Sequence, residues 1–342
     1  MDQWRSEVRP ATLEKFRETI YGRNPVEEPP QAEWLVSTVA HAAGGLVVSD
    51  CVYRFSGPGG KGAIKVRLVQ PENPGKRLPL FLLINNRSPD LADLSKPNEF
   101  WPAAEIAKRG YSAAIFHVSD ADPDKNEGFK DGVHAIFDGG SRKKDSWGTI
   151  AAWSWAASRV VGEFAKMETI DPKRIAVAGH SRGGKAALWC GAQDERVALT
   201  ISNESGCTGA ALSRRPHGET VADINRACPH WFCENYKRFN GREQDLPVDQ
   251  HQLIGLIAPR LAYVASAQED DWADPAGEFL ACVHASPAYR IHGMPGLESD
   301  IMPAAGHHLH AGNIGYHLRP GKHNLTLVDW KLFMEFADRH WK

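Results

Sequence analysis

The sequence predicts an α/β fold in which a mainly parallel sheet lies between helices on both of its faces, as a three-layer sandwich. The first observation is a series of helical stretches, of which 150–164 is the clearest, with apolar residues at helical spacing. The second is that short apolar runs alternate with these helices. Strands that are apolar along their whole length are buried on both faces, as parallel strands under helices are. The runs are 80–84, 112–116, 174–179, 199–202 and 261–266.

The N-terminal part precedes this alternation. Residues 1–30 predict a lead-in helix and a proline-rich connector, with the segment 27–30 ending the helix. Strands are expected at 45–48 and 63–69, and the second alternates apolar and charged residues as a half-exposed strand does. The pair Pro74-Gly75 predicts the turn before the first buried strand.

No internal repeat and no linker divides the chain, so we expect a single domain over residues 1–342. Two segments interrupt the strand and helix pattern, one at about 213–249 and one at about 293–321. We expect both to be insertions that lie over the edge of the sheet where an active site would be found.

Composition excludes several classes of protein. Lys and Arg number 40 against 42 Asp and Glu, a formal net charge of −2, so the chain lacks the basic surplus of a nucleic-acid binder. No apolar run approaches the ~20 residues that cross a membrane, and the first residues lack the apolar region of a signal peptide. Eleven tryptophans hint at a carbohydrate ligand.

The strongest local motif is the G-x-S-x-G match at 179–183, between a buried strand and the helical run 185–189. A sharp strand-to-helix turn would present the Ser181 hydroxyl above the sheet, and the small residues beside it prevent collisions in that turn. The backbone N–H of Arg182 could then donate to an oxyanion. Ser181 is therefore the predicted nucleophile, the alternative being a glycine-rich turn in a non-catalytic protein.

A nucleophilic serine needs a base and an orienting acid. In α/β-hydrolases the acid and then the histidine follow the serine along the chain, which makes His323 the expected base. Glu204 and Asp270 each follow a predicted strand at the carboxyl edge, and the residues alone do not rank them firmly, although Asp270 is slightly favoured. Other histidines gather nearby, but without the spacing of a metal motif, so no metal or other cofactor is expected. They are His307, His308, His310 and His317.

Several motifs together resemble carbohydrate esterase family 15, the glucuronoyl esterases. The run 179–185 is similar to that family's G-C-S-R-x-G-K signature, and 203–211 is similar to its E-S-G-x-G-G-A-A block. The resemblance covers nearly the whole chain. It continues through 229–233, 246–251, 258–260, 270–278 and 321–323.

The resemblance implies an α/β-hydrolase that cleaves the ester between (4-O-methyl-)glucuronic acid on glucuronoxylan and lignin alcohols, through an acyl-enzyme and without a metal. It implies that Arg182 holds the oxyanion, and that Lys185, Glu219 and Trp272 contact the sugar. Fungal members place the acid at the position of Glu204, and many bacterial members place it at that of Asp270.

We expect a monomer. The resemblance implies a secreted or periplasmic protein, but the chain shows no signal peptide, so a cytoplasmic protein stays open as an alternative. One departure from the family pattern is His180, where the fungal signature has a disulfide-forming cysteine, so that disulfide is not expected here. Two other functions stay open. One is a serine esterase on another carbohydrate or small alkyl ester, such as acetylxylan, and the other is a carbohydrate-binding protein without catalysis.

Overall fold

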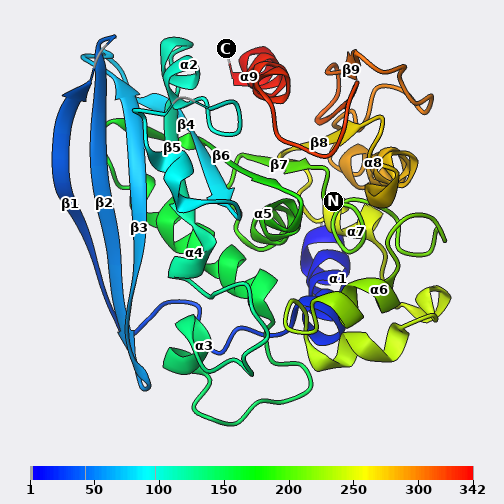
Figure 1. Ribbon diagram of the computed structural model, residues 1–342. Coiled ribbons are helices and arrows are strands. Elements are labelled where there is room, and N and C mark those ends of the chain that lie inside the picture. The colour runs from blue at the N-terminus through cyan, green and yellow to red at the C-terminus, as the bar shows by residue number, and fades with distance from the viewer. Residues whose placement is uncertain (1–2, 43, 97, 342) are drawn as a thin grey trace.

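The computed structural model describes residues 3–42, 44–96 and 98–341. Its strands form one sheet in the order β1-β2-β3-β5-β4-β6-β7-β8-β10-β9 (Figure 1). The pairs from β5 through β4, β6, β7 and β8 to β10 are parallel, whereas the outer pairs at both ends are antiparallel. The strands are β1 Gln31–Ala42, β2 Leu46–Gly57, β3 Gly60–Pro71, β4 Leu78–Asn85, β5 Ser112–His117, β6 Ile170–His180, β7 Leu199–Asn203, β8 Leu261–Ala267, β9 His307–Leu309 and β10 Ile314–Arg319.

Helices cover the sheet, and in the described part of the chain none of them is both long and apolar enough to cross a membrane. The α-helices are α1 Arg9–Phe16, α2 Ala103–Lys108, α3 Gly132–Phe137, α4 Thr149–Phe164, α5 Arg182–Gln193, α6 Val221–Ala227, α7 Gln250–Gly255, α8 Pro275–Arg290 and α9 Leu327–Trp341. Short π-helical and 3-10 segments are η1 Trp4–Val8, η2 Arg17–Tyr21, η3 Pro89–Ala92, η4 Val118–Asp120, η5 Glu234–Phe239, η6 Glu243–Asp245 and η7 Asp271–Ala273.

Alternate residues of the central strands feed two separate cores. In β4, Leu80 and Leu82 pack with α4 and α5, whereas Phe81 and Leu83 pack with α2 and α9. Successive side chains of a strand point to opposite faces, so a strand that is apolar throughout fills a core on each side. The predicted three-layer arrangement with helices on both faces is therefore confirmed, and Figure 1 shows α2 and α9 apart from α4 and α5.

The five predicted central strands are all present, but the sequence missed β1. Among the described residues this edge strand pairs with β2 alone, and its described side chains are exposed or half-buried, so its apolar run is short, at 34–36. Strands 45–48 and 63–69 are also longer than predicted, as parts of β2 and β3.

The expected insertion at about 293–321 is in part wrong, because this segment contains β9 and β10. β10 pairs in parallel with β8 inside the sheet. Its buried residues include His317 and Arg319, and a strand with buried polar or charged side chains does not stand out as an apolar run. The other segment, about 213–249, is less irregular than expected, since it holds α6, η5 and η6.

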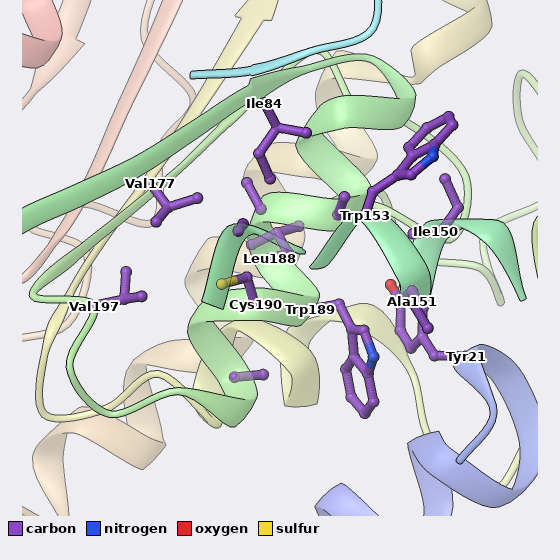
Figure 2. Packing of buried hydrophobic residues seen from close by; sticks show 14 of the residues in the cluster. Tyr21, Ile84, Ile150, Ala151, Trp153, Val177, Leu188, Trp189, Cys190 and Val197 are labelled. Carbon is purple, nitrogen blue, oxygen red and sulfur yellow. The ribbon is translucent and has the colours of Figure 1, made fainter. Parts of the chain in front are cut away.

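The lead-in helix packs against the helix that follows the predicted nucleophile. It ends at Tyr21 rather than at 27–30, because Gly22 has φ +87° and a Cβ there would collide with the backbone of Trp147. Tyr21 stacks on Trp189 of α5 with ring centroids 4.4 Å apart, and its hydroxyl donates to the carbonyl of Thr208 at 2.8 Å. Figure 2 shows this aromatic pair below Leu188. The N-terminal segment thus supports α5 from beneath.

Candidate active site

Ser181 lies at the sharp turn between β6 and α5. Its backbone is at φ +56° and ψ −125°, a conformation that costs a non-glycine residue about 1–3 kcal/mol. A Cβ at position 179 would collide with the backbone of Gly183, and a Cβ at position 183 would lie only 3.0 Å from the carbonyl oxygen of Ile84, which explains the glycines on either side. The Ser181 N–H donates to the carbonyl of Asn203 at 2.9 Å and ties the turn to β7. This is the geometry of a nucleophile elbow.

His323 follows β10 and meets both candidate acids through one ring nitrogen. Its Nδ1 lies 2.6 Å from Asp270 Oδ2 and 3.2 Å from Glu204 Oε2. Both carboxylates are buried, and the imidazole is about one third exposed. Carboxylates accept, so Nδ1 carries a proton, and in the neutral form of the ring Nε2 is left to accept one. The structure thus brings both predicted acids to the predicted base.

These two carboxylates set the charge of the base. Burial by itself would lower the pKa of His323, but the hydrogen bonds to Asp270 and Glu204, with their negative charges, outweigh it and raise the pKa to about 9. The imidazolium form of His323, the predicted base, is therefore strongly stabilised.

Glu204 has a second set of partners that Asp270 lacks. Its Oε1 accepts from Arg319 Nη2 at 2.6 Å, and its Oε2 accepts from the N–H of Asn324 at 2.8 Å. Arg319 also pairs with Asp329 at 3.1 Å and donates to the carbonyl of Asn324 at 2.7 Å. Glu204 and Arg319 together fasten the loop that carries His323. Sequence reasoning missed Arg319, which lies 115 residues from Glu204.

A third carboxyl group, Glu278 of α8, lies near the two acids. It is fully buried, and it accepts from the N–H of Gly206 at 2.9 Å and from the hydroxyl of Ser266 at 2.6 Å. Burial, with the negative charges of Glu204 and Asp270, raises the pKa of Glu278 to about 8. Glu278 is therefore largely uncharged at neutral pH.

His180, Glu204 and His323 place ligand atoms within 4.8 Å of one another, a spacing that a metal ion could bridge. However, Nε2 of His180 lies 3.1 Å from the Arg87 guanidinium, which can only donate, and Nδ1 lies 2.6 Å from Asn203 Oδ1. Burial, followed by the positive charge of His323, lowers the pKa of His180 to about 3. Both nitrogens of this neutral ring are occupied, so the trio does not fit a metal. The His180 ring packs against that of His323 at 4.4 Å instead.

Arg182 begins α5, and the first N–H groups of a helix have no acceptor within it. Its backbone can therefore donate to an oxyanion beside Ser181. Its side chain forms an ion pair with Asp124, with Nε 2.7 Å from Oδ2, and donates to the carbonyl of Asn86 at 3.3 Å. Asp124 is a second residue that sequence reasoning missed.

Lys185 lies one helical turn from the serine, and contacts link it to Glu219 and, through Glu219, to Trp272. Lys185 is buried and donates to the carbonyls of Ser205, at 2.6 Å, and Cys207, and its Nζ is 3.9 Å from Glu219 Oε2. The N–H of Glu219 donates to the carbonyl of Trp272 at 2.9 Å. Trp272 is 58% exposed, so it is a surface residue rather than a core residue.

Three comparisons with known proteins show what this chain is similar to. Residues 105–293 match the family described as glucuronyl esterases of fungi. The chain is 36% identical, with a TM-score of 0.91, to a promiscuous CE15 esterase from a marine bacterial metagenome, over 99% of this chain and 93% of that one. It is 34% identical, with a TM-score of 0.93, to a glucuronoyl esterase from Solibacter usitatus, over 100% of this chain and 94% of that one.

Among curated proteins, the chain is 49% identical over 243 residues to carbohydrate esterase MZ0003 of an unknown prokaryotic organism. The match covers 70% of this chain and 56% of that protein, so the chain spans about half of this relative's length. It covers 28% of the 4-O-methyl-glucuronoyl methylesterase of Podospora anserina, at 38% identity over 137 residues. With its whole length matched by solved structures and more than half of it by the family, the chain belongs to carbohydrate esterase family 15, the glucuronoyl esterases.

Proposed function

We propose that this protein is a serine esterase that hydrolyses the ester between (4-O-methyl-)glucuronic acid of glucuronoxylan and a lignin alcohol. The observation that carries the proposal is that two groups of residues lie on either side of Ser181. His323 with its two carboxylates lies against residue 180, next to the nucleophile elbow, and the Lys185, Glu219 and Trp272 cluster lies one turn of α5 away.

In the first half of the reaction, Ser181 Oγ attacks the ester carbonyl while His323 Nε2 takes the hydroxyl proton. The carbonyl oxygen becomes an oxyanion that the N–H and guanidinium of Arg182 stabilise. When the C–O bond to the alcohol breaks, His323 returns the proton to the leaving oxygen. Water then attacks the acyl-enzyme in the same way and releases the uronic acid and the serine.

The sugar cluster supplies the substrate preference. The ester of a uronic acid carries no charge at its carboxyl but has several ring hydroxyls. Lys185 can donate to such hydroxyls, Glu219 can accept from them, and the exposed Trp272 ring offers a flat apolar face to the sugar. A site without this cluster would not distinguish a uronate from a simple acyl group.

The test is a comparison of rates on one purified preparation, with benzyl glucuronate and 4-nitrophenyl acetate as substrates and Ser181→Ala as the control. We expect a strong preference for the glucuronate. Equal or reversed rates would keep the serine esterase and remove the uronate claim, in favour of another carbohydrate or alkyl ester. Saturable uronate binding without turnover of either ester would favour the carbohydrate-binding alternative.

We also propose that the protein acts as a monomer. We further propose that it acts outside the cytoplasm, because a polymeric cell-wall ester does not enter cells. Light scattering in solution and fractionation of the source cells test these two points.

A further inference from the structure

The side chain of Arg182 is held on two sides. Its Nε lies 2.7 Å from Asp124 Oδ2, and its Nη2 donates to the carbonyl of Asn86 at 3.3 Å. The guanidinium also lies 5.8 Å from the centre of the Trp231 ring. Among the described residues, no hydrogen bond engages Nη1. A guanidinium fixed in this way keeps the Nη1 edge for another acceptor.

Asp124 contacts other residues besides Arg182. Its Oδ1 accepts from His230 Nε2 at 3.0 Å and from Trp231 Nε1 at 2.7 Å, while Oδ2 faces Arg182. Burial would raise the pKa of Asp124, but these two hydrogen bonds and the charge of Arg182 lower it. Both oxygens are thus directed by fixed partners, and the group stays ionised.

The partners of Asp124 are themselves anchored. The carbonyls of His230 and Trp231 accept from the N–H groups of Thr149, at 3.0 Å, and Ile150, at 3.2 Å. These donors are the first residues of α4, and most residues of that helix are buried. A rigid helix therefore holds the pair that orients the carboxylate, which in turn faces Arg182.

We propose that Asp124 is a positioning residue for Arg182: it holds the guanidinium so that its free edge meets the ester oxygen as charge develops there. Preorganised donors contribute most when they need no reorganisation during the reaction. The inference rests on the proposed function only in that Ser181 attacks an ester. If it is right, replacing Asp124 lowers kcat only when Arg182 is present.

A purely structural role is the competing explanation, because Asp124 also joins the 118–124 segment to His230 and Trp231. In that case its removal would lower stability and would act on activity independently of Arg182. A double-mutant cycle separates the two roles, since residues that act as one unit are not additive.

The experiment measures kcat and KM of wild type, Asp124→Asn, Arg182→Ala and the double variant, on benzyl glucuronate and on 4-nitrophenyl acetate. We expect Arg182→Ala to lower kcat by roughly 10²–10³. Asp124→Asn should lower kcat by about 10–100-fold with little change in KM, and by less than about twofold in the Arg182→Ala background. The effect should appear with whichever ester is turned over, so a wrong substrate assignment does not imitate a failure.

Asp122→Asn is the matched control. Asp122 is a buried carboxyl two residues away that accepts from the Thr149 hydroxyl at 2.6 Å, and its pKa is raised by burial to about 7. Its replacement should leave kcat nearly unchanged. Melting temperatures are compared for every variant. If Asp124→Asn does not fold, Trp231→Phe removes one donor to Asp124 and should give a smaller fall in kcat.

Equal effects of Asp124→Asn in both backgrounds would overturn the inference, as would a lower melting temperature with unchanged kcat. An unchanged kcat in Arg182→Ala would overturn it as well, because Asp124 would then have no catalytic group to position. Failure of the proposed function is a separate result, namely turnover of the ester by Ser181→Ala.

Discussion

The two sides of the Ser181 turn differ in how charge is arranged. On the side of the predicted base, two carboxylates that follow β7 and β8 face a single nitrogen of His323. On the other side, Arg182 and Lys185 of α5 present positive charge, and each has an acid within 4 Å. In the proposed mechanism, proton transfer creates a cation on the first side, and attack on the ester creates an oxyanion on the second. The comparison teaches that each side is prepared for the charge that the reaction produces there.

The largest expected effect on kcat comes from removing the hydroxyl of Ser181, which lies between the two sides. Ser181→Ala should lower kcat by about 10⁶, because loss of the nucleophile alone costs about as much as loss of the whole triad. The variant should keep its circular dichroism spectrum and its affinity for glucuronate by calorimetry. Retained turnover would show that neither side serves this serine.

The next effect breaks the base side alone. The double variant Glu204→Gln with Asp270→Asn should lose about 10⁴ in kcat, the loss expected when a histidine is misoriented. Each single variant should lose less, because the other carboxylate still faces Nδ1. Steady-state rates of the three variants test this. If one single variant already reaches the full loss, the other carboxylate serves only to hold the loop.

A smaller effect belongs to the substrate side. Lys185→Met keeps the length and apolar stem of the side chain but removes its charge, and a hydrogen bond to a charged group is worth about 1.5–3 kcal/mol. We expect kcat/KM for benzyl glucuronate to fall roughly 10–150-fold. The rate on 4-nitrophenyl acetate is the internal control and should change little. An equal fall on both esters would mean that Lys185 supports the fold of the site instead.

The smallest effect is a displacement of the pH profile. The base must be neutral to take a proton, so with a His323 pKa of about 9 the wild-type kcat/KM should rise until about pH 9. Either single acid variant removes a negative charge that raises this pKa, so the rising limb should move down towards 6.5, the ordinary value for histidine. Lys185→Met should leave the limb in place. An unmoved limb in both acid variants would contradict the role of the carboxylates.

Much of the reaction centre could be predicted from the sequence because its signals are local. The turn at Ser181 lies between an apolar strand and a helix, and both acids follow apolar strands. The central strands were found for the same reason. Strands β1 and β10 were missed, since one is an exposed edge and the other buries polar or charged side chains.

The residues that orient the centre were not visible in the sequence. Arg319 meets Glu204 across 115 residues, and Asp124 meets His230 across 106. Neither belongs to a motif, and an isolated arginine or aspartate is usually a solvated side chain. Only the register of β10 beside β8, and the placement of 228–233 on α4, bring them to the site.

The buried carboxyl of Glu278 has a consequence for the proton inventory of folding. Its pKa rises from 4.5 to about 8 in the folded chain, so folding takes up a proton that the unfolded chain has released between those values. The raised pKa of His323, from 6.5 to about 9, acts in the same direction. The stability from each group is fully present below its unfolded pKa and is lost as the pH rises through the folded value. Raising the pH thus increases the fraction of neutral His323 while it lowers the free energy of unfolding. The upper limit of the working pH range is therefore set by loss of the fold rather than by loss of the base.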